Sequence, residues 1–161
     1  MSHSKLSIAF YNLENLFDTI NDPNILDDDF TPKGDLNWNK SRYAEKLRKL
    51  STIISKIGKA ETGDAPVFLG VAEVENKKVL KDLIATEALA TLNYDFVHHN
   101  SPDERGIDTA LLYRKDVFEV LESRSYTLHI NNAEGLRDYT RDILYIHGTL
   151  EGVELFILVN V

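Results

Sequence analysis

The chain has 161 residues, of which 43% are hydrophobic and 27% charged, with a net charge of −8 and no cysteine. This composition suits one globular domain, and the missing thiols exclude a disulfide framework, a thiolate zinc site and a cysteine nucleophile. Proteins that coat nucleic acid through phosphate neutralisation are usually basic, so the acidic total argues against that role. We find no signal-peptide pattern and no apolar run of about 20 residues, and we expect a cytoplasmic protein without a membrane partner.

The first half of the chain alternates strand and helix patterns. Residues 6–11 are apolar and predict a buried strand, and residues 12–38 form a long polar connection. Asn39 or Ser41 caps a predicted helix that runs to about residue 57, and residues 66–74 predict a strand that is buried on both faces. Asn76 then caps a helix with apolar residues at helical spacing as far as residue 84. This order predicts a crossover that leaves the first two strands parallel.

The second half predicts strands only, at residues 94–98, 107–113, 117–130, 140–150 and 153–161. The last two are joined by a tight connection at Glu151 and Gly152. Together the patterns indicate the α/β class. Residues 155–159 have high β-propensity and no charge, so we expect an uncovered strand edge there to favour self-association of the chain.

Two polar residues follow the predicted parallel strands. Asn12 and Glu73 lie at the C-terminal ends of these strands, at the rim where ligand sites collect in such sheets. One carboxylate and one amide meet the modest demand of magnesium for protein ligands. Each residue also has a plainer interpretation. Glu73 is an acid of the kind favoured before a helix, and Asn12 is a turn residue that bonds its own backbone.

Three further charged residues stand at the starts of predicted strands. Arg105 and Asp108 form either the wall of a pocket or a turn with a surface salt bridge. Arg141 is either a solvated charge at a strand edge or a planar ligand that grips phosphate oxygens in two places. No nucleophile-elbow motif and no phosphate-cradling glycine-rich loop is found, so nucleotide-driven chemistry has no support in the sequence.

Four stretches, in this order and spacing, resemble the endonuclease/exonuclease/phosphatase family. They are Ser-Ile-Ala-Phe-Tyr-Asn-Leu-Glu-Asn-Leu-Phe-Asp at residues 7–18, Gly-Val-Ala-Glu-Val-Glu-Asn at 70–76, Arg-Gly-Ile-Asp-Thr-Ala-Leu-Leu-Tyr-Arg at 105–114, and Thr-Arg-Asp-Ile-Leu at 140–144. In the resemblance, Asn12 matches the family's active-site asparagine and Glu73 its metal-binding glutamate. Arg141 matches an arginine that approaches the substrate phosphate in some members.

The resemblance implies a four-layer α/β sandwich of two similar halves, of which residues 1–161 are the N-terminal part of a single domain. It further implies Mg²⁺- or Mn²⁺-dependent hydrolysis of phosphodiesters or phosphomonoesters. Asn12 and Glu73 are then catalytic and metal-binding, and Arg141 binds the substrate phosphate. We expect Arg105 and Asp108, the candidates for a pocket wall, to bind substrate as well. DNA, RNA, inositol phosphates, lipid head groups and small diesters are all cleaved within the family, so the substrate stays open.

The family's catalytic histidine, its Asp-x-Asn pair and its terminal Asp-His follow the stretches matched here. Water activation needs those groups, so we expect this chain by itself to be inactive. An alternative function is a non-catalytic binding module that keeps the half-fold and offers the acidic loop at residues 27–29 to a partner.

Overall fold

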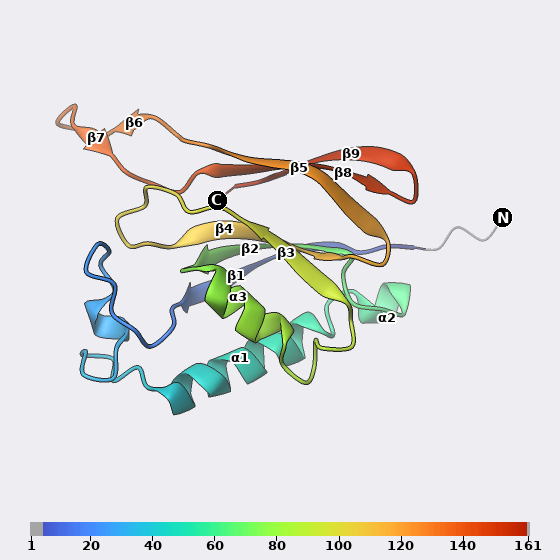
Figure 1. Cartoon of the computed structure of the whole chain (residues 1–161), viewed down its shortest axis with the longest axis horizontal. Coiled ribbons are helices and arrows are strands. Elements are labelled where there is room, and N and C mark those ends of the chain that lie inside the picture. The colour runs from blue at the N-terminus through green and yellow to red at the C-terminus, as the bar shows by residue number, and fades with distance from the viewer. Residues whose placement is uncertain (1–4, 161) are drawn as a thin grey trace.

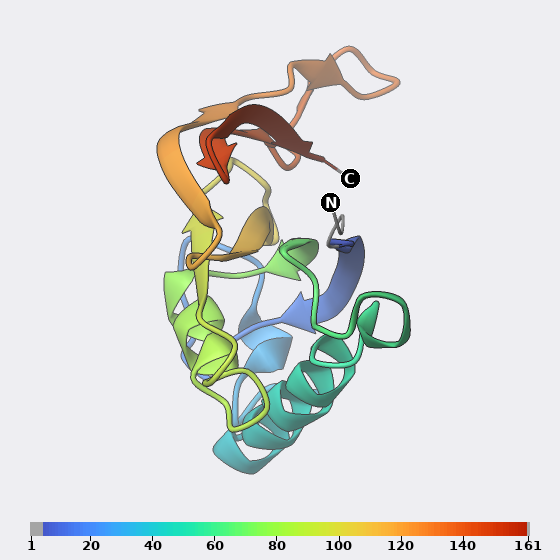
Figure 2. The same cartoon turned by 90° about the vertical axis from the view of Figure 1, so that its right-hand side faces the viewer.

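Three layers make up the computed structural model, which describes residues 5–160. The outer layer holds two helices, α1 (Lys40–Ile54) and α3 (Lys77–Ile84), and Figures 1 and 2 show them on one side of a first sheet with a second sheet on the other side. The first sheet has the strand order β1-β2-β4-β3 and the second β5-β8-β9, so the predicted α/β class is confirmed.

The strands of the first sheet are β1 (Ile8–Leu16), β2 (Phe68–Val74), β3 (Tyr94–His98) and β4 (Asp108–Arg114). Those of the second are β5 (Phe118–Tyr126), β8 (Ile143–Leu150) and β9 (Val153–Val159). Short elements complete the fold: η1 (Asp28–Phe30), α2 (Lys59–Thr62), and the pair β6 (Ile130–Asn131) and β7 (Arg137–Asp138). Within residues 5–160, no helix has both the length and the apolarity to span a membrane.

Both long helices begin where the sequence predicts. The Asn39 side chain accepts the backbone N–H groups of the first turn of α1, and Asn76 does the same for α3. The first helix ends at Ile54, earlier than predicted, because a turn takes over and leads into Gly58, whose φ is +69°. Apolar residues on the inner faces of α1 and α3 pack on the first sheet around Leu69 and Val71.

The first two strands run parallel, as predicted, and β4 pairs antiparallel with both β2 and β3. Consequently the C-terminal ends of β1, β2 and β3 and the start of β4 meet at one edge of the sheet, on the left in Figure 1. We call this edge the rim. A second core cluster, with Phe68, Phe118 and Ile146 among its members, fills the space between the two sheets.

Three predicted strand boundaries are wrong. The strand predicted over residues 6–11 continues to Leu16, so Asn12 lies inside β1 and the polar connection begins later than predicted. The strand predicted over residues 117–130 ends at Tyr126, and the chain continues into the β6-β7 pair, whose turn is stabilised by the Asn132 side chain accepting two backbone N–H groups. The strand predicted from residue 140 begins at Ile143. Arg141 therefore lies in the loop before β8. In this loop the carboxylate of its neighbour Asp142 accepts hydrogen bonds from the hydroxyls of Ser125 and Thr127.

Candidate active site

Glu73 is an extra residue in β2 relative to β4, because Ala72 pairs with Thr109 and Val74 with the next residue, Asp108. On the other side Asn12 pairs with Ala72 and Leu16 with Val74, so three residues of β1 stand opposite Glu73 and the larger bulge belongs to β1. Glu73 adopts a φ of +63°, in the left-handed region that costs a non-glycine residue about 1 kcal/mol or more. Such bulges re-aim a side chain and are common beside active sites.

The bulge has a direct consequence for the direction of the carboxylate. Strict alternation along β2 would place Glu73 on the same face as Val71, against the apolar core beneath the helices. Val71 and Val74 instead both belong to that core, and the inserted residue lies between them. The extra residue therefore keeps the charged group out of the helix-side core while the strand still buries its valines.

A matching irregularity occurs in β1 opposite Glu73. Glu14 and Asn15 have φ values of +54° and +58°, so the chain turns through two left-handed residues there. The Asn12 carboxamide accepts the backbone N–H of Glu14 at 2.7 Å, which is the turn interpretation of this residue. The backbone N–H of Asn15 donates to Oε2 of Glu73 at 2.9 Å. The sequence predicts Asn12 and Glu73 on one rim, and the register places Asn12 opposite Ala72, the residue before Glu73.

The half-buried Glu73 carboxylate has one oxygen occupied and one oxygen open. Oε2 accepts the Asn15 amide, whereas Oε1 receives no hydrogen bond from the described residues. Asn12 is exposed, and its Oδ1 keeps a second lone pair beyond the one used by Glu14. Residues 5–160 hold no group of three or more His, Asp or Glu side chains arranged for a metal ion. The arrangement suits magnesium, which retains several waters, better than zinc or calcium.

Asp108 starts β4 beside the bulge, but its side chain points into the protein. It is 3% exposed, accepts the backbone and hydroxyl groups of Ser101, and pairs with Nε2 of His98 at 3.0 Å. The buried network ties the end of β3 to the start of β4. Arg105 lies on the exposed loop between these strands, where its Nε is 3.5 Å from Asp103.

Arg141 carries a guanidinium that lacks acceptors. Its Nε and Nη1 are shielded from solvent and have no hydrogen-bond partner within residues 5–160. Oδ1 of the adjacent Asp142 is also buried and unpaired among these residues. Because buried charges are normally paired, an unpaired guanidinium marks a place where an anionic ligand is favourable.

The sequence patterns did not reveal a second acidic group just below the rim. Glu75 is 8% exposed and accepts the backbone N–H of Asp18, which is itself 6% exposed. Burial, together with the negative charges of Asp18 and Asp27, raises the pKa of Glu75 to about 7. Glu73 is half-buried at the rim, whereas Glu75 is buried. The sequence does not predict this difference in burial, because the two glutamates flank the same valine.

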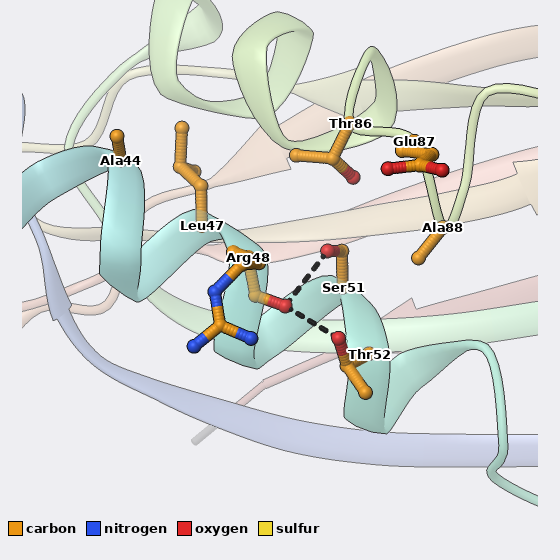
Figure 3. Close-up of a pocket in the computed structure, with 8 residues that line it drawn as sticks. All are labelled: Ala44, Leu47, Arg48, Ser51, Thr52, Thr86, Glu87 and Ala88. Atoms are coloured by element: carbon orange, nitrogen blue, oxygen red, sulfur yellow. Dashed lines mark hydrogen bonds between the residues drawn. The ribbon is translucent and has the colours of Figure 1, made fainter.

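A hollow between α1 and the segment that follows α3 lies away from the rim (Figure 3). Its polar groups are satisfied locally, because the hydroxyls of Ser51 and Thr52 both donate to the backbone oxygen of Arg48. Thr86 likewise donates to the backbone oxygen of Leu83. The charged residues of its lining are Arg48 and Glu87, and neither belongs to a group that could hold a metal ion within residues 5–160.

A sequence model described as the Endonuclease/Exonuclease/phosphatase family matches residues 7–161. Because the match covers nearly the whole chain, the chain belongs to that family, whose members act on phosphate esters. No curated protein sequence gives a significant match.

Solved structures with the same fold include humanized TDP2 of D. rerio, carrying 14 mutations, with a TM-score of 0.54 and 17% identity over 96% of this chain. A family protein from Bacteroides vulgatus matches with a TM-score of 0.52 and 22% identity over 93% of this chain. D. rerio TDP2 complexed with a single-strand DNA product matches with a TM-score of 0.51 and 17% identity over 95%. The chain spans 46%, 49% and 44% of these three structures, about half of each, as a half-fold should.

Proposed function

We propose that this chain is the metal-holding part of a divalent-metal-dependent hydrolase of phosphate esters, a phosphodiesterase or nuclease. The observation that carries the proposal is the Glu73 carboxylate, which lies where β1 and β2 both bulge. One of its oxygens accepts the Asn15 amide and the other is open. Strain at a non-glycine residue persists where the surrounding structure over-determines it, and such residues cluster at functional sites.

Magnesium or manganese is the cofactor that this donor set fits. Glu73 supplies the anionic oxygen, and Asn12 supplies a neutral oxygen from the neighbouring strand. When bound, the ion polarises the scissile phosphate and stabilises the charge on the leaving oxygen. The role of the bulge is to hold the carboxylate at the rim, out of the apolar core, where a hydrated ion and a phosphate both have access.

Arg141 is the proposed phosphate ligand. Its unpaired Nε and Nη1 support this role, because a phosphate supplies the acceptors that the described residues do not. Arg105 stands on the exposed loop and is proposed to contact the part of the substrate beyond the phosphate. Asp108, which is buried, accepts hydrogen bonds from Ser101 and lies 3.0 Å from Nε2 of His98, is proposed to shape the substrate wall by fixing that loop.

The proposed substrate class is a phosphate ester. One structural relative holds a single-strand DNA product, which makes nucleic acid a reasonable first substrate to test. The net charge of −8 disfavours tight binding to a duplex and favours a substrate that is gripped at one phosphate. Because the chain spans about half of the solved structures it matches, hydrolysis is proposed for the whole family domain.

The test is Glu73→Gln, which keeps the size and one acceptor but removes the negative charge. In the chain itself, addition of Mn²⁺ should broaden the amide NMR signals around Asn12 and Glu73 in the wild type and leave them sharp in the variant. In the complete family domain, hydrolysis of bis(p-nitrophenyl) phosphate should fall by orders of magnitude. Glu104→Gln, an exposed acid on a loop at the same rim, is the matched control. Equal broadening in Glu73→Gln and wild type would contradict the metal assignment.

The alternative of a binding module that uses its acidic loop receives less support. Asp27 is 2% exposed, and its carboxylate accepts the backbone N–H of Asp22. Asp28 is bonded by the side chain of Asn21. Two of the three acids in the loop therefore stabilise the loop itself, which leaves little of its charge free for a partner.

A further inference from the structure

Lys46 on α1 reaches across to the bulge from the helix layer. Its ammonium donates to the backbone oxygen of Glu14 and lies 3.4 Å from that of Asn15. The same group sits 5.6 Å from the ring centroid of Trp38, which is 7% exposed. Burial lowers the pKa of Lys46, while the charges of Glu14 and Glu73 oppose that change. An ammonium in this position is costly unless the carbonyls it meets compensate for the lost water.

The peptide bond between Glu14 and Asn15 connects Lys46 to Glu73. Its carbonyl oxygen, which belongs to Glu14, accepts from Lys46, and its N–H, which belongs to Asn15, donates to Oε2 of Glu73 at 2.9 Å. In a trans peptide these two groups point in opposite directions, so the chain of contacts runs from cation through amide to carboxylate. A cation on the carbonyl withdraws electrons from the amide, which strengthens the hydrogen bond that its N–H makes.

Both ends of this peptide need an external support. Glu14 and Asn15 adopt left-handed conformations that favour glycine, and neither is glycine. Asn12 bonds the N–H on the far side of Glu14, but it makes no contact with the Glu14–Asn15 peptide itself among the described hydrogen bonds. Lys46 is the side chain that bonds the carbonyls of this turn.

We propose that Lys46 is a positioning residue for Glu73, which holds the Glu14–Asn15 peptide so that its amide fixes one carboxylate oxygen and leaves the other directed to the ion. The proposal rests on the proposed function of Glu73 and adds to it a residue 27 positions away that touches neither metal nor substrate. Groups that orient a metal ligand typically change metal affinity by about 10- to 100-fold when removed.

The test is Lys46→Met, which keeps the apolar stem against Trp38 and removes the ammonium. In the metal-free chain, the Asn15 amide proton should shift upfield and exchange faster with solvent. In a Mn²⁺ titration, affinity should fall by about tenfold. In the complete family domain, kcat should fall while KM stays near the wild-type value. Lys46→Arg restores a cation and should recover most of the Asn15 shift. Lys49→Met, one turn further on the exposed face and paired with Glu45, is the matched control and should change none of these.

An unchanged Asn15 amide in Lys46→Met would overturn the proposal, and so would an unchanged Mn²⁺ affinity in a variant whose Asn15 signal has moved. If Lys46→Met fails to give a dispersed NMR spectrum, Lys46→Gln takes its place, and an unchanged Asn15 signal there is equally decisive. Failure of the proposed function looks different, because Glu73→Gln would then leave Mn²⁺ binding intact whatever Lys46 does.

Discussion

The backbone amide of Asn15 donates to Oε2 of Glu73 at 2.9 Å, which joins two residues that both have positive φ. Each bulge therefore supports the other, because the turn in β1 presents the amide only when its residues are left-handed, and Glu73 meets it only when β2 carries an extra residue. The geometry of the carboxylate is a property of the pair of strands. A substitution that straightens either strand is expected to disturb both.

Arg141→Ala is predicted to weaken phosphate binding without affecting the metal. The guanidinium has no acceptor within residues 5–160 to lose, so truncation should leave the free energy of unfolding within about 1 kcal/mol of the wild type. In the presence of Mg²⁺, titration of the chain with inorganic phosphate should shift the amide signals of residues 140–143 in the wild type and not in the variant. Mn²⁺ affinity should be the same in both.

Arg124→Ala provides the comparison, because Arg124 is an exposed arginine on β5 that is paired with Glu122. It should leave phosphate binding unchanged. A loss of stability in Arg141→Ala with no change in phosphate binding would mean that Arg141 is a structural residue.

Much of the fold follows from the sequence because its strongest patterns are local. The apolar run before Glu73 predicts a strand buried on both faces, and the cap residues Asn39 and Asn76 mark the helix starts. The parallel pairing of β1 and β2 then follows from the handedness and length of the connection between them. The placement of Asn12 and Glu73 on one rim rests on that pairing alone.

The parts that the sequence does not disclose depend on contacts between distant residues. Nothing in the order of residues 70–76 indicates a bulge at Glu73, because the left-handed conformation there is imposed by β1 and β4 together. The role of Lys46 is hidden for the same reason, because a lysine in a helix that also carries Arg48 and Lys49 predicts a solvated charged side. The sequence predicts Arg141 in a strand, whereas the strand starts only after Asp142. The hydroxyls that bond Asp142 come from Ser125 on β5 and Thr127 just after it, which are distant in the sequence.

The buried carboxyl of Glu75 predicts a stability that falls as pH rises. Burial is the main cause of its raised pKa of about 7, and the unfolded value is near 4.5. Between these two values the folded state binds more protons than the unfolded state, so the contribution is present below pH 4.5 and is lost as pH rises through 7. The loss is at most about 3 kcal/mol. Urea unfolding of the chain in EDTA, measured from pH 5 to pH 8 (about the span of the titration), checks it.

Glu75→Gln retains an acceptor for the Asp18 amide and cannot ionise, so it should flatten this pH dependence and be the more stable protein at pH 8. The exposed Glu61→Gln should leave the profile unchanged. A variant Glu75→Gln with the same slope as the wild type would show that another group titrates.

We expect this chain to self-associate through β9, which is an edge strand of the second sheet. Within residues 5–160 this strand pairs only with β8, so its other side presents free N–H and C=O groups. Its outer face exposes 64% of Phe156 and 66% of Leu158. We expect the sedimentation coefficient of the chain to rise with protein concentration, and Leu158→Lys to suppress the rise because a charge on an edge strand opposes pairing. Leu121→Lys on β5 should have little effect, since that edge is already interrupted by a bulge. A concentration-independent sedimentation coefficient in the wild-type chain would contradict the expectation.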